Sequence, residues 1–448
     1  MKLWEKGNQS EKFIEEFTVG QDPDLDLYLA PYDILGSIAH VLMLKDVGLL
    51  EDEETSRLQS ELITLYRESA NGHFTIENGI EDVHSQVEAI LSRRLGDTGK
   101  KIHTGRSRND QVLVDLHLFI RDQIREIVLK MKDLAETLLG LSEQYKNYLL
   151  PGYTHFQVAM PSSFGLWFGC FAESLADDLL VFRAAYHFAN QNPLGSGAGF
   201  GTSFPINRKR TTELLGFDDL SYNVMYAMNK RGRTEKAMAQ AISSVADTLG
   251  KLSSDLCMYM GQDFGFVSLP GKFTTGSSIM PHKSNPDVFE LVRGYCNQFI
   301  SLPNEISLIV SNLPTGYHRD FQLIKESFIP SIYKIKSCIT IVNQILPELK
   351  IEEIDMSCGK YKYIFSVEEV NKLVMKGVPF RDAYREIADK IEKGEYQSSP
   401  DIKHTHEGSM GNLCNERISE KIQNRILEFN FEKEQKALQK LLEMNADM

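Results

Sequence analysis

The sequence predicts an all-α fold, built around an elongated central bundle of long helices with smaller helical units at its N- and C-terminal ends. Prolines, which interrupt helices, are absent from residues 32–150, 162–192 and 206–269. Apolar residues recur every three or four positions over 110–149 and again over 236–260, which is the period of a helix. Alternating strand-like runs bounded by Asn-Gly or Asp-Gly are scarce.

The length of 448 residues indicates two or three structural units. We expect an N-terminal helical domain over 1–105, the long-helix bundle over 106–353 and a C-terminal helical domain over 354–448. Apolar faces that run the length of such helices commonly pack against copies of the same chain, so the sequence predicts a homo-oligomer with the bundle as its core.

A formal net charge of −13 argues against a protein that binds nucleic acid or an anionic membrane, so an anionic ligand must meet local cations. The six cysteines include no C-x-x-C pair and no zinc spacing, which is typical of free thiols in a reducing compartment. The segment MKLWEKGNQSEKF has no apolar signal core. We therefore expect a cytoplasmic protein without nucleic-acid or membrane partners.

The segment TTGSSIMPHKSNPDVFELVRG, residues 274–294, combines two serines, a lysine and a late glutamate. It is not a Walker loop, because His282 and not glycine precedes Lys283, and the GSGAGFG run over 195–201 likewise fails the dinucleotide-binding spacing. No G-x-S-x-G elbow marks a nucleophile. Backbone N–H groups of a small-residue loop can instead make Ser277 a base, with Lys283 stabilising the developing negative charge. An ordinary glycine-serine turn remains the alternative.

A second segment, HTGRSRNDQ over 103–111, places two arginines and an asparagine directly before the first long helix. Such residues at a helix N-terminus form a carboxylate site through backbone N–H groups and bidentate arginine. The alternative is a capping segment with solvated arginines.

Thr154 and His155 lie in the loop-like segment PGYTHFQ, ahead of Pro161 and a new helix. A lone histidine is often structural, but Glu290 is a carboxylate that can orient and charge it. His404 and His406 lack a third ligand, so no metal is predicted there. The acidic run DPDLD over 22–26 is interpreted as a solvated turn without metal.

Together these segments resemble the fumarase/aspartase superfamily of homotetrameric lyases and, within it, the argininosuccinate lyases. GSSIMPHKSNP is similar to the superfamily's signature loop, whereas HTGRSRNDQ and PGYTHFQ are similar to the argininosuccinate lyase segments. The resemblance extends through YDILGSIAH, EDVHSQVE, GSGAGFGTSFPINR, GYHRDFQLIK and KGVPFRDAYREI.

The resemblance implies that Ser277 takes a proton from the succinyl carbon of argininosuccinate. Lys283 and Asn285 would hold the aci-carboxylate, and His155, paired with Glu290 and with Thr154 nearby, would assist protonation of the leaving nitrogen. The implied substrate-binding residues are Ser107, Arg108, Asn109, Tyr317, Gln322, Lys325 and His84. The products would be arginine and fumarate, formed by anti elimination without metal or organic cofactor, in active sites that three subunits of a tetramer share.

Three positions depart from the family pattern: His282 and Ser284 in MPHKSNPD, and Asp22 in place of a substrate-contacting serine. Two alternatives stay open. An elimination of the adenylosuccinate lyase type is disfavoured by HTGRSRND, and a catalytically silent, crystallin-like structural protein is disfavoured by the retention of Ser277, Lys283, His155 and Glu290.

Overall fold

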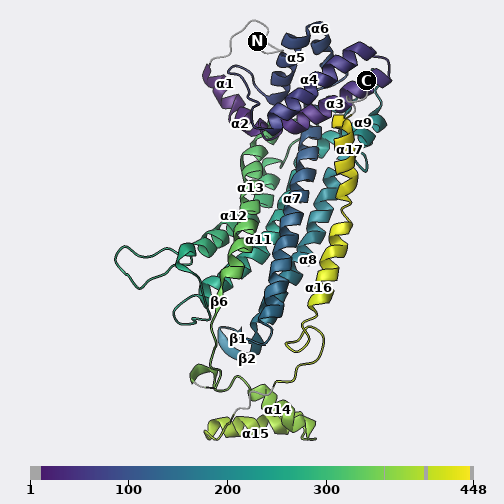
Figure 1. Cartoon of the computed structure of the whole chain (residues 1–448). Coiled ribbons are helices and arrows are strands. Elements are labelled where there is room, and N and C mark those ends of the chain that lie inside the picture. The colour runs from purple at the N-terminus through teal and green to yellow at the C-terminus, as the bar shows by residue number, and fades with distance from the viewer. Residues whose placement is uncertain (1–11, 358, 398–401, 444–448) are drawn as a thin grey trace.

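Long helices run side by side through the middle of the molecule, between a helical head and a small helical foot (Figure 1). The computed structural model describes residues 12–357, 359–397 and 402–443. The bundle consists of α7 (Arg108–Gln144), α8 (Phe164–Ala189), α11 (Arg233–Tyr259), α12 (Asp287–Ile309) and α13 (Ile324–Ile345). The predicted all-α bundle is therefore confirmed.

The helix α7 sets the length of the bundle. Its 37 residues correspond to about 55 Å at 1.5 Å per residue. It begins with a capping box, in which Ser107 and Asp110 each accept from the other's backbone N–H. The periodic stretches over 110–149 and 236–260 thus became α7 and α11, with helix ends a few residues away.

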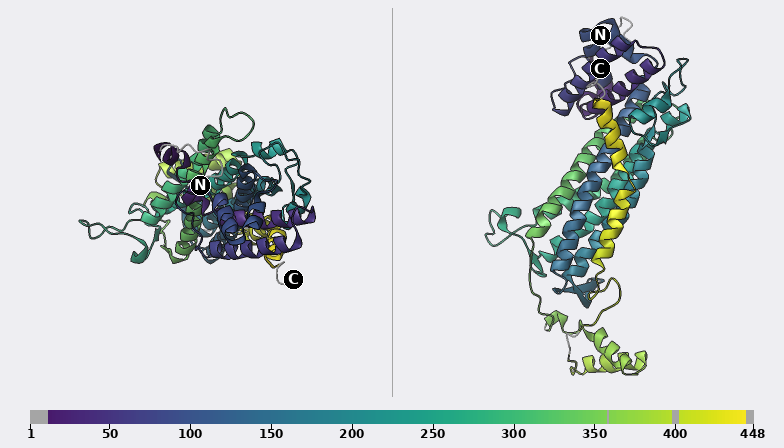
Figure 2. Two further views of the ribbon diagram at one scale, coloured as in Figure 1. Left: turned by 90° about the horizontal axis from the view of Figure 1, so that it is seen from above. Right: turned by 45° about the vertical axis from the view of Figure 1, so that its right-hand side comes forward.

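The head covers one end of the bundle and the foot lies beyond the other (Figures 1 and 2). The head contains α1 (Lys12–Val19), α2 (Asp22–Asp26), α3 (Ala30–Asp46), α4 (Asp52–Ala70), α5 (Val83–Leu95) and α6 (Asp97–Lys100). The foot consists of α14 (Ser366–Met375) and α15 (Phe380–Glu392), and the last two helices are α16 (Asn415–Leu427) and α17 (Phe431–Glu443). Two short helices follow α8 in the sequence and precede α11: α9 (Arg208–Leu214) and α10 (Val224–Asn229).

Three hydrophobic clusters hold these parts together. One runs along the bundle and includes Ile418 and Ile422 of α16, and a second fills the head and includes Leu441 of α17. The third is a small cluster of α14 and α15 around Ile387. The chain therefore returns from the foot, along α8 and α7, to the head. The domain boundaries at 105 and 353 stay a prediction.

Short strands interrupt the helices at three places. β1 (Leu149–Thr154) and β2 (Gln157–Ser163) form an antiparallel hairpin; β3 (Gln191–Asn192) pairs with β4 (Asp219–Leu220), and β5 (Val267–Ser268) with β6 (Lys350–Ile351). The interpretation of 151–157 as a loop was wrong, and Pro161 lies in β2. The hairpin turn consists of His155 and Phe156, both left-handed with φ of 54° and 58°.

Five cysteines, at 170, 257, 296, 338 and 414, are free thiols, whereas Cys358 and most of MKLWEKGNQSEKF fall outside the described residues. Among the described helices, none alone has the length and apolar character to cross a bilayer. One bent pair, Glu16–Asp26 with Ala30–Asp46, meets those criteria by length and composition only.

Candidate active site

The segment before α7 is held in place by a buried aspartate. Asp110 is 0% exposed; one of its oxygens accepts from the backbone N–H of Ser107 at 2.9 Å. The other accepts from the backbone N–H groups of Gly195 and Gly197, at 3.0 Å each. Ser107 Oγ in turn accepts from the N–H of Asn109 at 3.3 Å. The Ser-Arg-Asn run is therefore fixed at the helix N-terminus, where a carboxylate binds favourably.

Arg108 is fixed by the start of α5. Its guanidinium donates to Ser85 Oγ at 2.6 Å and lies 3.1 Å from Asp82 and 3.6 Å from Glu81. Asp82 is the N-cap of α5, where it also accepts from the backbone of Ser85 at 2.8 Å. Arg106 is only 8% exposed and donates to Ser37 at 2.9 Å. The alternative of a capping segment with solvated arginines is thus half right: Ser107 and Asp110 cap α7, but Arg106 is buried and Arg108 is paired.

His84 lies in the same turn of α5 but is almost fully buried. Its Nδ1 lies 2.9 Å from Asp33 of α3 and 3.6 Å from Asp115 of α7. Burial lowers the pKa of His84, but the charge and hydrogen bond of Asp33, together with Asp115, outweigh burial and raise it to about 9. One possible ligand atom from each of these three side chains lies within 4.8 Å of the other two, which is close enough for all three to bind one metal ion.

Gln322 contacts the last residues of α1, and Lys325 contacts α2. Gln322 donates to the carbonyls of Thr18 and Val19 at 3.3 and 2.9 Å. The Nζ of Lys325 lies 2.5 Å from Asp22 and 2.7 Å from Asp26. The prediction of a solvated turn over 22–26 was wrong, because the segment is the short helix α2. Asp26 is only 4% exposed, and the charge of Lys325 compensates its burial.

The turn before α13 and the helix α2 both contact the start of α5 and the segment that precedes it. Arg319, in the 3₁₀ turn Arg319–Leu323 before α13, lies 2.9 Å from Glu81. Asp26, which holds Lys325, also accepts from the backbone N–H of Val83 at 3.3 Å. The residues that the sequence predicted as substrate-binding therefore gather at the head end, although Tyr317 stays 43% exposed.

The loop that carries Ser277 extends from the side of the bundle ahead of α12 (Figure 1). The Oγ of Ser277 accepts hydrogen bonds from the backbone N–H groups of Met280 at 3.1 Å and Ile279 at 3.3 Å. The loop closes where Asn285 N–H donates to the carbonyl of Thr275 at 2.8 Å. Lys283 is exposed, so its charge is available to a ligand.

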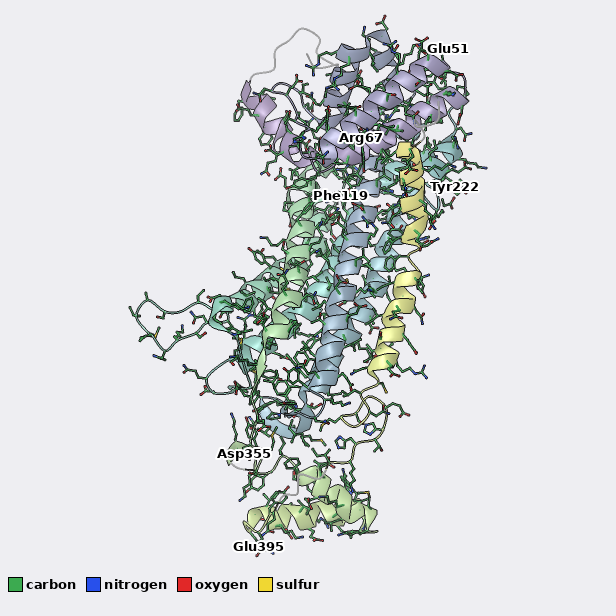
Figure 3. The ribbon with its side chains drawn as sticks, viewed as in Figure 1. Glu51, Arg67, Phe119, Tyr222, Asp355 and Glu395 are labelled. Carbon is green, nitrogen blue, oxygen red and sulfur yellow. The ribbon has the colours of Figure 1, made fainter. Side chains whose placement is uncertain are left out.

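Thr154 and His155 lie at the end of the bundle opposite the head. In Figure 3, Phe119 of α7 lies near the head and Asp355 lies near the opposite end. Asp355 lines a cavity together with Leu149, the first residue of β1, so the hairpin lies at that opposite end as well. His155 is exposed and lines a cavity of about 500 Å³ with aromatic residues of α8 and α11. Within the described chain, no hydrogen bond or ion pair joins His155 to Glu290, which is exposed on α12.

One chain thus brings some of the candidate residues together and leaves others apart. His84, Arg108 and Lys325 share the head end with their neighbours, whereas His155 lies beyond the far end of α7, about 55 Å away along its axis. The sequence analysis did not identify Asp110 as the residue that fixes the segment before α7. The capping-box pattern S-x-x-D over 107–110 could have identified it.

The comparisons with known proteins bear on the family and the fold of the chain. Residues 4–301 match the family model described as Lyase. The chain is 55% identical over 441 residues to the argininosuccinate lyase of Bacteroides fragilis strain YCH46, covering 98% of this chain and 99% of that protein. It is 39% identical over 389 residues to the argininosuccinate lyase of Thermotoga neapolitana, covering 87% and 98%. A solved structure of EDDS lyase with formate superposes with a TM-score of 0.75 at 22% identity, over 98% and 95% of the two chains.

The fold, the family model and the match to a lyase over 98% of the chain define a lyase of the fumarase/aspartase type. Within that class, the chain belongs to the argininosuccinate lyase family.

Proposed function

We propose that this protein cleaves argininosuccinate into arginine and fumarate, for arginine biosynthesis. The observation that carries the proposal is the full-length similarity to argininosuccinate lyases. The residues that the sequence singled out also have suitable surroundings, because Ser277 Oγ accepts two backbone N–H groups and Arg108 is fixed at a helix N-terminus.

In the proposed reaction, Ser277 acts as the base. The two N–H donors stabilise its alkoxide, which takes a proton from the succinyl carbon next to a carboxylate. The electron pair moves into that carboxylate, which becomes a doubly negative aci-carboxylate. Lys283 and Asn285 lie on the same loop and supply positive charge and a hydrogen-bond donor to it.

The second half of the proposed reaction breaks the carbon-nitrogen bond. The electron pair returns to form the double bond of fumarate, and the nitrogen of arginine leaves. His155, oriented by Glu290 and assisted by Thr154, delivers a proton to that nitrogen. Ser107, Arg108, Asn109 and His84 bind the carboxylates, and Tyr317, Gln322 and Lys325 line the pocket.

We also propose a homotetramer in the cytoplasm, in which several copies contribute to each site. The support is the length of α7, which separates Arg108 from His155 by far more than a substrate of this size can span. Copies placed antiparallel would bring the head end of one chain to the hairpin of another.

A panel of four substrates tests the proposed function. Purified protein, with its assembly checked by light scattering, is given argininosuccinate, adenylosuccinate, aspartate or malate, and fumarate is followed by its ultraviolet absorbance. We expect fumarate from argininosuccinate. Activity with adenylosuccinate alone would replace the proposed substrate, and an inactive but assembled protein would favour the crystallin-like structural role.

A further inference from the structure

No step of the proposed elimination uses Asp33 or Asp115, yet both are buried beside a candidate substrate-binding histidine. Each of three helices brings one side chain: α3 contributes Asp33, α5 His84 and α7 Asp115. Both aspartates are 0% exposed, and burying a carboxylate charge is costly unless another group compensates it. Such a cluster persists when its charges compensate one another.

The hydrogen bond fixes which ring nitrogen of His84 faces the carboxylates. Nδ1 lies 2.9 Å from Asp33 Oδ1, which accepts because a carboxylate has no proton to donate, and Asp115 lies 3.6 Å from the same nitrogen. Nδ1 therefore carries a proton. The other nitrogen, Nε2, has no hydrogen-bond partner among the described residues, so it is available to a ligand.

His84 is also a close neighbour of Arg108. Ser85, the next residue along α5, accepts from the Arg108 guanidinium at 2.6 Å, and Asp82 of the same turn lies 3.1 Å from it. Consecutive residues of α5 thus carry the imidazole and the hydroxyl that holds the guanidinium, and the same turn contacts α7 through both Arg108 and Asp115.

We propose that Asp33 is a positioning residue that keeps His84 as an imidazolium cation, so that Nε2–H binds a carboxylate of the substrate beside Arg108. This role rests on the proposed function and deepens it, because it adds a second fixed cation to the substrate site. A neutral imidazole with its proton on Nδ1 would instead turn a lone pair toward the carboxylate.

The charges around His84 support a cation at neutral pH. The carboxylates that face it are Asp33, Asp115 and Asp82, and the nearby cationic or titratable groups are Arg106, Arg108 and His103. Burial, and after it the charge of Asp33, raise the pKa of Asp115 well above its usual range, so the hydrogen bond from His84 is directed at Asp33 and not at Asp115. Because the pKa of His84 is raised to about 9, its proton is present below that pH and is lost above it.

The same three side chains also form a donor set for a divalent cation. The direct hydrogen bond satisfies Nδ1 of His84 and Oδ1 of Asp33 without a metal, whereas Oδ2 of Asp33 and both oxygens of Asp115 have no hydrogen-bond partner among the described residues. The buried guanidinium of Arg106, which has two unpartnered nitrogens, would in addition repel a metal ion. The proton is therefore the better occupant, and metal analysis tests the difference.

The experiment compares the KM for argininosuccinate of the wild type and Asp33→Asn from about pH 6 to about pH 8.5. Without the Asp33 charge, His84 loses its proton near or below its ordinary pKa. We expect a KM that rises roughly tenfold or more over this range in Asp33→Asn but stays flat in the wild type, with kcat changing less. Asp178→Asn is the matched control, since Asp178 is a buried bundle carboxylate bound by Ser244 and Thr248.

A KM shift in Asp33→Asn that is the same at every pH would overturn the proposal, because loss of structure alone predicts that result. Stoichiometric divalent metal in the wild type that disappears from Asp33→Asn would also overturn it. If Asp33→Asn does not assemble, His84→Gln replaces it: a KM raised across the whole range supports the proposal, and an unchanged KM contradicts it. A wild type inactive on argininosuccinate would refute the proposed function itself, which separates the two failures.

Discussion

Lys325 of α13 and Asp22 of α2 lie 2.5 Å apart between Nζ and Oδ1. A second carboxylate, Asp26, lies 2.7 Å from the same ammonium, and all three side chains are largely buried. One positive charge is therefore shared by two negative charges. Burial raises the pKa of Asp22 to about 6, although the charge of Lys325 opposes that rise.

The raised pKa of Asp22 predicts a pH-dependent stability. The folded protein holds the Asp22 proton up to about pH 6, whereas the unfolded chain releases it near 3.8, so stability falls as pH rises between these values. Asp22→Asn should remove that loss, on the order of 2–3 kcal/mol. Denaturant unfolding at several pH values measures it. Asp24→Asn, a change at an exposed neighbour, is the control and should show no such trend; parallel curves for Asp22→Asn would contradict the prediction.

Asp110→Ala should destabilise the protein and impair substrate binding together. The change leaves the backbone N–H groups of Ser107, Gly195 and Gly197 without their buried acceptor. We expect a loss of about 3 kcal/mol or more in the free energy of unfolding and a raised KM. Asp97→Ala, at an exposed carboxylate, is the control. A normal KM in Asp110→Ala would show that this aspartate does not position the Ser-Arg-Asn run.

Ser277→Ala should abolish turnover while the oligomer remains intact. Loss of a general base costs roughly a hundredfold to ten-thousandfold in rate, and the exposed loop contributes little to the core. The rate of fumarate formation measures the effect, and light scattering measures assembly. Ser278→Ala is the adjacent control and should retain most activity. If the Ser277 variant turns over normally, another group is the base.

The long helices were predictable from the sequence because local signals specify them. Proline-free stretches and a three-to-four residue apolar period lie within each helix, so α7 and α11 needed no knowledge of their neighbours. The candidate residues were found through contiguous motifs for the same reason. The base-like surroundings of Ser277 also arise within four residues.

Contacts between distant segments were not predictable in this way. Lys325 pairs with Asp22, which is distant in the sequence. The residues DPDLD alone do not distinguish a buried helix from a solvated turn. The hairpin at Thr154 was not predicted because its strands are short. Its turn also lacks the glycine that usually marks a left-handed backbone, since His155 and Phe156 occupy the turn positions. The pairing of His84 with Asp33 and Asp115 likewise required three helices to be packed.

The most direct test of the account is to mix two variants that are each inactive. Arg108→Gln disables the head end of α7 and His155→Asn disables the hairpin, which one chain holds about 55 Å apart. The two homo-oligomers are dissociated, mixed and reassembled, mass spectrometry confirms mixed assemblies, and argininosuccinate cleavage is measured. Sites shared between copies predict partial recovery of activity, because some sites then contain both intact residues. Mixed assemblies that remain inactive would contradict the shared site.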